Sequence, residues 1–420
     1  MWLWLPHLEG AVACELYLKW VSTLLFALFF FGNVSLRQPR NYTTEMPGIS
    51  TKSIHADQSL NRVPDVVPPI NVTTTFRYPD DPDDIIPATE YQNDSYDPST
   101  STPIYSRIGH PNSARIEQVM SELLGGETVI YNSGLSAFFA AIMYFNPKTV
   151  AIGDGYHGCH GILELLKRNY NLKIVGLDQL DQLAKGDLIH IETPENPFSR
   201  VHNIAYYVSK AKEIGAFTLV DATFAPPPLS NPFDFNVDMV MHSVTKYFGG
   251  HSDLLAGVLV TKDPAVKIQL ARDRVVLGTN IANLESYLLL RSLRTYELRI
   301  EKQSDSATKL VKYLSGNRAK YPKITSIYHS SLQKDDFVDA QMTGGHAPVF
   351  SIELDTPENA KSLPSKLKYF QHATSLGGVE SLIEWRAVTD KNAKKTLLRV
   401  SVGVENVEDL IADFDQALKS

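Results

Sequence analysis

Cysteine is scarce in this chain, which has only two among its 420 residues, Cys14 and Cys159. They lie far apart and outside any metal-ligand spacing, so the sequence predicts neither a metal site nor a disulfide framework. This scarcity favours a reducing compartment. We interpret Cys159 as a small buried residue, and a reactive thiol beside a functional site is the alternative.

An excess of basic residues is also missing. The chain has 40 Lys and Arg against 47 Asp and Glu, a net charge of −7, which argues against a nucleic-acid partner. No internal repeat or low-complexity segment interrupts it. A chain of this length and composition predicts about two domains with a large core.

Long hydrophobic runs are the third absence, and only one candidate occurs. Trp20–Phe31 is almost wholly apolar but shorter than the roughly 20 residues of a membrane-spanning helix. Glu9 and Glu15 before it make a poor secretory signal, whereas the arginines after it would keep the remaining chain cytoplasmic if the run were an anchor. A third interpretation starts translation at Met46. We favour this third interpretation and expect a cytoplasmic protein. Residues 1–48 are then an N-terminal extension, and the protein would contact a membrane only if this apolar segment is translated and acts as an anchor.

From about Ser106 onward, short apolar runs alternate with longer helical patterns. The preceding residues 47–101 are polar, proline-rich and too rich in turns to form core. The alternation predicts βα units around a largely parallel sheet. We place the strands at Thr128–Tyr131, Thr149–Gly153, Lys173–Leu177, Leu188–Glu192, Phe217–Val220 and Met239–His242.

Polar residues follow several of these strands. In open α/β sheets, ligands bind beyond the carboxyl ends of the strands, so these residues are candidates for one shared site. The first strand is followed by Asn132–Ser136, a turn of small residues that opens a helix and leaves backbone N–H groups facing an anion. This pattern predicts a phosphate seat, and an ordinary N-cap by Ser133 is the alternative.

Single side chains after three other strands extend the pattern. Tyr156 lies among glycines and either stacks on a flat ligand or packs as a core tyrosine. Asn196 projects from a proline-rich loop as a hydrogen-bond donor, and the alternative is that this loop only terminates the strand. Asp221 directly follows an apolar strand, where it is either an N-cap or the counter-charge of a buried cation such as a protonated pyridine nitrogen.

The sixth strand leads into a segment that contains Lys246 among hydroxyl residues and glycines. A lysine that forms an imine needs a partly neutral amine, which burial and cationic neighbours provide. Ser243 and Thr245 offer hydroxyls to a phosphate. A phosphate seat, a stacking aromatic ring, an aspartate and such a lysine together describe a pyridoxal phosphate pocket.

The chain from about Ser50 to its end also resembles the Cys/Met-metabolism (trans-sulfuration) enzymes of the cystathionine γ-synthase, γ-lyase and β-lyase type. It looks closest to the uncharacterised fungal branch, whose members also carry Ile383–Arg386. The motifs that carry the resemblance are Tyr105–Arg107 with His110-Pro111, Asn132–Gly134, Asp221–Phe224, Ser243–Asp253, Ser375–Leu382 and Leu398–Glu405.

The resemblance implies an α/β protein of the fold-type I pyridoxal phosphate transferases. Residues 106–295 would form a large domain with a mostly parallel seven-stranded sheet and the cofactor. Residues 296–420 would form a smaller α/β domain that closes over a small amino-acid substrate, and residues 49–105 an arm that contacts a neighbouring subunit. A homo-oligomer, arranged as a dimer of active dimers, would follow.

The same resemblance implies the roles of single residues. Lys246 would hold the cofactor covalently and then shuttle protons, Asp221 would keep the pyridine nitrogen protonated, and Tyr156 would stack on the ring during catalysis. Further cofactor contacts would come from Gly134, Leu135, Ser243 and Thr245 at the phosphate, Asn196 at the ring hydroxyl, and Tyr105 and Arg107 of a neighbouring subunit, while Ser375 and Arg399 would hold the substrate carboxylate.

Departures from the family pattern bear on the substrate. Many relatives have asparagine where this chain has Ala222, and glycine and threonine at His157 and Cys159. The γ-acting enzymes often place a glutamate at the position of Thr374, associated with the distal amine of cystathionine, which puts cystathionine in doubt as the substrate. Leu376 resembles the γ-enzymes, where bacterial β-lyases tend to have tryptophan, and favours γ-chemistry.

Alternation in the C-terminal part predicts half-buried strands at Val349–Leu354 and Leu397–Val402, and an apolar stripe predicts a helix at Val407–Leu418. Trp385 and Arg386 either replace a substrate-contact loop or are a packed tryptophan beside a surface arginine.

Three functions stay open. The first is a trans-sulfuration enzyme that makes or breaks a carbon–sulfur bond of a homoserine ester or thioether amino acid. The second is γ-substitution with a carbon or nitrogen nucleophile, and the third is a catalytically idle cofactor-binding or assembly protein. The presence of Lys246, Asp221, Tyr156 and Arg399 argues against the third.

Overall fold

The computed structural model describes residues 47–87 and 103–419 of the chain. The apolar run Trp20–Phe31, the alternative start Met46 and the turn-rich residues 97–101 lie outside the described residues. Within the part that is described, no helix combines the length and the apolar character needed to cross a bilayer.

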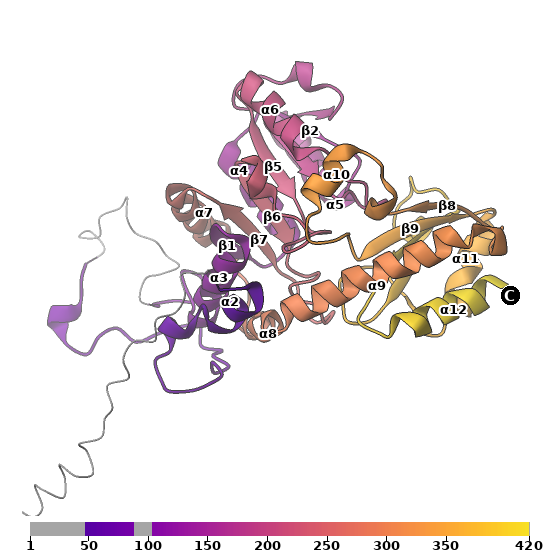
Figure 1. Cartoon of the computed structure of the whole chain (residues 1–420). Coiled ribbons are helices and arrows are strands. Elements are labelled where there is room, and N and C mark those ends of the chain that lie inside the picture. Colours follow the sequence, from indigo (N-terminus) through magenta and orange to yellow (C-terminus); the bar gives the residue numbers. More distant parts are fainter. Residues whose placement is uncertain (1–46, 88–102, 420) are drawn as a thin grey trace, which may run out of the picture. The chain divides into compact units, whose positions relative to one another are not determined.

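A seven-stranded sheet with the order β1-β7-β6-β5-β4-β2-β3 organises residues 127–261 (Figure 1). Six strands share one direction, and only β7, Gly257–Thr261, runs antiparallel to its neighbours. The mostly parallel sheet is therefore confirmed, although the sequence did not locate β7. The others end within one residue of prediction: β1 Glu127–Tyr131, β2 Thr149–Ile152, β3 Lys173–Gly176, β4 Leu188–Glu192, β5 Phe217–Asp221 and β6 Met239–Ser243.

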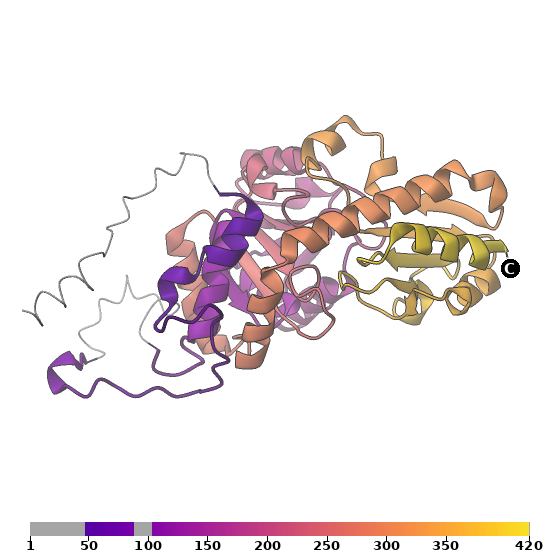
Figure 2. The same cartoon turned by 60° about the horizontal axis from the view of Figure 1, so that its bottom comes forward.

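Helices cover both faces of this sheet (Figures 1 and 2). Successive side chains of a strand point to opposite faces, so Leu188 and Ile189 of β4 belong to separate apolar cores. The core of Leu188 also contains Cys159, which is buried as expected. That core is packed by α4 Gly134–Phe145, α5 His157–Tyr170 and α7 Pro264–Leu277, and the opposite one by α3 Pro111–Leu124, α6 Ile204–Ile214 and α8 Asn283–Leu293.

A second, mixed sheet with the order β10-β11-β12-β9-β8 forms the C-terminal part. The long helix α9, Tyr296–Gly316, joins both parts, because Ile300 packs in the first core and Leu310 in that of the second sheet (Figures 1 and 2). A domain boundary at Tyr296 therefore stays a prediction. The remaining elements are β8 Ile324–Tyr328, α10 Asp336–Gln341, β9 Val349–Leu354, α11 Pro357–Lys366, β10 Gln371–His372, β11 Leu382–Trp385, β12 Leu397–Ser401 and α12 Val407–Lys419.

The end of β11 corrects one expectation. Trp385 is partly buried and its Nε1 donates to the Lys395 carbonyl at 2.7 Å, as a packed tryptophan should. Arg386, by contrast, is only 3% exposed, so the expectation of a surface arginine at this position is wrong. The reason is local: Glu384 and Thr389 both accept hydrogen bonds from its guanidinium.

The start of the N-terminal arm is packed against the core, although residues 47–101 were expected to be too rich in turns to form core. The helix α2, Ile49–His55, lies against α3 and α9. Asp57 is buried and forms ion pairs with Arg115 at 3.2 Å and Arg294 at 2.8 Å. These charges anchor the start of the arm, whereas residues 61–75 are mostly exposed.

Candidate active site

The carboxyl ends of three parallel strands bring polar side chains to one edge of the large sheet. β4, β5 and β6 end in Glu192, Asp221 and Ser243. Glu192 and Asp221 are register partners, and Asp221 pairs in turn with Met241 of β6. This edge is where the sequence predicted a site, because ligands of open α/β sheets bind there.

Lys246 follows β6 and points its amine at the C-terminal part of the chain. Its Nζ donates a hydrogen bond to Ser375 Oγ at 3.0 Å. Burial, and then the nearby Arg399 guanidinium, lower the pKa of the Lys246 amine to about 8, while Glu384 and Asp221 oppose this shift. Roughly a tenth of the amine is then neutral at pH 7. This environment is compatible with the partly neutral amine that an imine-forming lysine needs.

Asp221 is the buried carboxylate of the site. Its Oδ1 accepts hydrogen bonds from the Thr223 backbone N–H at 3.0 Å and the Thr223 hydroxyl at 2.5 Å. Burial raises the pKa of Asp221 to about 6, against the opposing effects of Thr223 and Lys246. A charged carboxylate in such surroundings is stabilised by a cation placed next to it.

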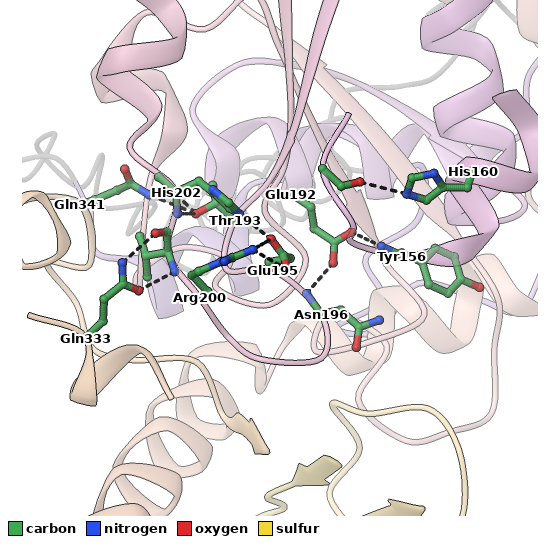
Figure 3. Close-up of polar contacts among 12 residues, drawn as sticks. Tyr156, His160, Glu192, Thr193, Glu195, Asn196, Arg200, His202, Gln333 and Gln341 are labelled. Atoms are coloured by element: carbon green, nitrogen blue, oxygen red, sulfur yellow. Dashed lines mark hydrogen bonds and ion pairs between the residues drawn. The ribbon is translucent and has the colours of Figure 1, made fainter. Parts of the chain in front are cut away.

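Glu192 is a functional candidate that the sequence analysis left without a role. Its Oε2 accepts from the Tyr156 backbone N–H at 2.5 Å and its Oε1 from the Asn196 backbone N–H at 2.8 Å (Figure 3). Burial, and then the Asp221 charge, raise the pKa of Glu192 to about 8. One side chain thus ties together the two loops that carry Tyr156 and Asn196. An acidic residue ending an apolar strand was the available signal.

The loop after β4 holds Asn196 through buried polar contacts (Figure 3). Glu195 is buried and accepts from Arg200 Nη2 at 2.8 Å, and its Oε2 lies 2.5 Å from His202 Nε2. Gln341 of α10 donates to a threonine hydroxyl of the same loop at 3.3 Å. Asn196 itself is buried and accepts from Arg399 Nη1 at 3.0 Å, so the loop is structural as well as polar.

Tyr156 stands at the N-terminal end of α5 and is 39% exposed. Its ring lies beside that of His157, with centroids 4.8 Å apart. Burial of part of the ring, followed by the influence of Cys159, raises the pKa of its hydroxyl. A core tyrosine would be buried on all sides, so an exposed ring at the sheet edge favours the alternative of a face presented to a ligand.

The predicted phosphate seat lies where α4 begins. Ser133 Oγ accepts from the Ser136 backbone N–H at 3.1 Å, so Ser133 is the N-cap. A Cβ built on Gly134 would lie 3.0 Å from Ser243 Cβ, which brings the helix N-terminus against the end of β6. The Thr245 hydroxyl, in contrast, donates to the Ala256 carbonyl at 3.2 Å and accepts from its N–H at 3.1 Å. In this arrangement Thr245 is tied to backbone.

Arg399 closes the site from β12. Its Nη1 donates to Asn196 Oδ1 and its Nη2 to the Ser375 carbonyl, both at 3.0 Å, and Nη2 also donates to Glu384 at 2.6 Å. Burial lowers the pKa of Arg399 to about 10, which keeps the guanidinium charged at neutral pH. Ser375 adopts a φ of +82°, a conformation that residues with a side chain rarely take. Ser375 connects Lys246 with Arg399, because its hydroxyl accepts from the lysine amine and its carbonyl accepts from the guanidinium.

Two predicted cofactor residues lie elsewhere on the chain. Tyr105 is exposed, and Arg107 donates from Nη1 to the Val275 carbonyl at 2.9 Å while its guanidinium lies 5.6 Å from the Tyr105 ring. Within the described residues, no hydrogen bond joins this pair to the group around Lys246. Their expected action on a neighbouring subunit stays a prediction.

The donor set fits a flat, anionic aldehyde with a basic ring nitrogen. A helix N-terminus without a Cβ at Gly134 suits a phosphate, and the buried Asp221 suits a ring cation. The partly neutral amine of Lys246 suits the aldehyde. Pyridoxal phosphate combines these three chemical features.

Comparison with known proteins gives a consistent result. The family model of the Cys/Met metabolism PLP-dependent enzymes matches residues 50–419. Cystathionine gamma-synthase of Escherichia coli K12 is 35% identical over 381 residues, 84% of this chain and 93% of that protein. Cystathionine beta-lyase of Lactococcus lactis subsp. cremoris is 33% identical over 402 residues, 89% of this chain and 100% of that protein. Cystathionine gamma-lyase of Dictyostelium discoideum is 31% identical over 408 residues, with 91% and 99% covered.

Solved structures agree with the sequence relatives. The metB protein of Corynebacterium glutamicum superposes with a TM-score of 0.79 at 27% identity, covering 90% of this chain and 99% of its own. Cystathionine gamma synthase of Xanthomonas oryzae pv. oryzae, solved with aminoacrylate and cysteine, gives 0.77 at 27% identity, with 89% and 98% covered. The solved structures share the fold, and the sequence relatives are a synthase, a β-lyase and a γ-lyase.

Proposed function

This chain belongs to the Cys/Met metabolism family of PLP-dependent enzymes, and we propose that it makes or breaks a carbon–sulfur bond of a homoserine-derived or thioether amino acid. The observation that carries the proposal is the connection Lys246–Ser375–Arg399. It places an amine able to move protons next to a guanidinium able to hold a carboxylate. Ser375 contacts both the Lys246 amine and the Arg399 guanidinium.

The cofactor contacts are part of the proposal. When bound, pyridoxal phosphate supplies an electron sink that makes the proton on the carbon beside the substrate amine removable. The residues that would hold it are Gly134, Leu135, Ser243 and Thr245 at the phosphate, Asp221 at the ring nitrogen, Tyr156 at the ring face, Asn196 at the ring hydroxyl, Lys246 at the aldehyde, and Tyr105 and Arg107 of a neighbouring subunit.

Lys246 is the proposed proton carrier. A pKa of about 8 lies near the working pH, where an amine accepts and returns protons most effectively. Its flexible four-carbon stem lets Nζ serve the α-carbon and, in γ-chemistry, the β-carbon as well. The hydrogen bond to Ser375 Oγ holds the amine on the side of the substrate-binding arginine.

Arg399 and Ser375 are the proposed carboxylate site. A guanidinium presents a planar fork that binds a carboxylate with two parallel hydrogen bonds. Asn196 and Ser375 orient Arg399 as neutral partners, while Glu384 is its one anionic partner, at 2.6 Å. This arrangement supports an amino acid as the substrate.

We favour γ-chemistry, because the buried Leu376 is the residue that resembles γ-acting enzymes. A second candidate, γ-substitution with a carbon or nitrogen nucleophile, is favoured by Thr374, an exposed residue without the charge that a distal amine would need. An idle cofactor-binding protein is disfavoured by the lowered pKa of Lys246.

The reaction is tested by incubating the cofactor-reconstituted protein with cystathionine and identifying the keto acid. Pyruvate identifies β-elimination, and 2-oxobutyrate identifies γ-elimination. If neither keto acid forms, the result indicates synthesis from an acylated homoserine, which is then tested with cysteine as the second substrate. Lys246→Ala should lose both the visible absorbance of the bound cofactor and all products. A wild-type protein that stays colourless after reconstitution would overturn the proposal.

We also propose a cytoplasmic homo-oligomer, arranged as a dimer of active dimers. Tyr105 and Arg107 lie exposed and outside the site of their own chain, which supports action in a second subunit. Mixing inactive Arg107→Ala with inactive Lys246→Ala should therefore restore part of the activity, since mixed dimers contain one intact site.

A further inference from the structure

Arg386 is a buried cation to which the proposed reaction gives no role. It is the first residue of a short 3-10 helix after β11 and is 3% exposed. Its Nη1 donates to Glu384 Oε2 at 3.0 Å and to Thr389 Oγ1 at 3.3 Å, and its Nε has no partner among the described residues. A guanidinium in this position costs free energy unless its charge stabilises the groups around it.

One oxygen of Glu384 is shared by two guanidiniums. Arg399 Nη2 donates to the same Oε2 at 2.6 Å, and Thr389 Oγ1 donates to Oε1 at 2.6 Å. Glu384 and Arg399 are register partners on β11 and β12, while Arg386 follows two residues after Glu384. The carboxylate is therefore divided between the proposed substrate-binding arginine and a second arginine behind it.

The charges of this cluster do not balance. Arg386 and Arg399 are two cations against the one anion Glu384, which leaves a net charge of +1 among three buried groups. Asp390 lies 3.7 Å from Arg386 Nη2 with 28% of its side chain exposed, so it offsets the charge of Arg386 only in part. Without Arg386, the pair of Glu384 and Arg399 would be neutral. Its attraction for an anion would then be much weaker.

We propose that Arg386 is a positioning residue that keeps Arg399 available to a carboxylate by competing with it for Glu384. This inference rests on the proposed function, in which Arg399 holds the substrate carboxylate. The anion that neutralises the surplus charge is then the substrate itself. The site selects amino acids with a free carboxylate and discriminates against their amides, which carry the same amine without the charge.

The test compares glycine with glycinamide, two amines that differ in the charge at the carboxyl carbon. Their dissociation constants are measured by calorimetric titration of the cofactor-loaded wild type and of Arg386→Gln, in which an amide donor replaces the charge. We expect the glycine dissociation constant to rise about tenfold and that of glycinamide to stay within about twofold. In turnover, the loss should fall on KM rather than kcat.

Two further variants separate charge from architecture. Arg386→Lys keeps the cation, so glycine binding should stay within about threefold of the wild type. Lys394→Gln removes a cation that pairs with Glu353 of the same sheet at 2.9 Å, and it should change neither ligand.

The inference is overturned if Arg386→Gln binds glycine as tightly as the wild type, or if it loses glycine and glycinamide to the same extent. A cofactor-loaded wild type that binds neither ligand would instead overturn the proposed function, and this inference with it.

Discussion

Glu192 and Asp221 stand directly opposite each other at the carboxyl ends of β4 and β5, so two carboxyl groups share one poorly hydrated region. The pKa of each is raised above its usual value by burial, and that of Glu192 is raised further, partly by the Asp221 charge. As the pH rises, the two carboxyl groups therefore lose their protons in two steps that belong to the pair. A cation beside Asp221 would favour the charged form of that carboxylate.

Glu192→Gln should change how stability depends on pH. A carboxyl group whose pKa is raised in the folded state holds its proton more tightly there, so stability falls as the pH rises from about 4.5 to about 8. Removing this titration should make the decline of the unfolding midpoint shallower over that range in thermal melts of the cofactor-free protein. Glu164→Gln, an exposed partner of Lys167, should follow the wild type. Parallel curves for wild type and Glu192→Gln would contradict the assignment.

Cofactor attachment should report the pKa of Lys246. Only the neutral amine attacks an aldehyde, so the rate at which visible absorbance develops after mixing with pyridoxal phosphate should rise with pH and level off above about 8. Stopped-flow measurements across this range locate the midpoint. Lys246→Ala should develop no band. A midpoint near the ordinary lysine value of 10.5 would show that burial does not act on this amine as described.

Gly134→Ala should weaken cofactor binding. The added Cβ would lie 3.0 Å from Ser243 Cβ and 3.1 Å from its Oγ, so one side of the proposed phosphate seat must move. We expect the dissociation constant of pyridoxal phosphate to rise about tenfold in an absorbance titration, since anion contacts at helix N-termini depend on close approach. Gly161→Ala is the matched control, because nothing lies within 4 Å of its Cβ in α5. It should leave the affinity unchanged and stabilise the helix by about 0.5–1 kcal/mol. Equal affinities for both variants would remove Gly134 from the seat.

Asp57→Asn should destabilise the fold. Asp57 is 1% exposed and pairs with both Arg115 and Arg294, so its neutralisation leaves two cations without their counter-charge. Breaking such a buried network costs about 3–5 kcal/mol, measured by urea unfolding. Asp305→Asn, which removes an exposed partner of Lys309, should cost less than about 0.5 kcal/mol. Similar values for the two variants would mean that the arm contributes little to stability.

Residues that follow strands were the part of the site within reach of sequence analysis. Apolar strands and the residues that end them are read from local pattern, and parallel strands bring their carboxyl ends together by topology. Asp221 and Ser243 therefore reach one edge, as expected. Glu192 ends such a strand too, but its importance lies in hydrogen bonds to two separate loops, which no local pattern encodes. The strand β7 was not placed, although Gly257–Thr261 is no shorter than the strands that were.

The order of residues by itself determined the α/β sheet, the family and the cofactor, because hydrophobic periodicity and motif spacing are local properties of the chain. The individual site roles and the domain boundaries stay predictions. Only the tertiary structure decided that Arg386 is buried, that Asp57 anchors the arm, and that Glu384 is divided between two arginines. The physical reason is that the energy of a charge depends on its distance to other charges and on its hydration. Both are set by segments far apart in the chain.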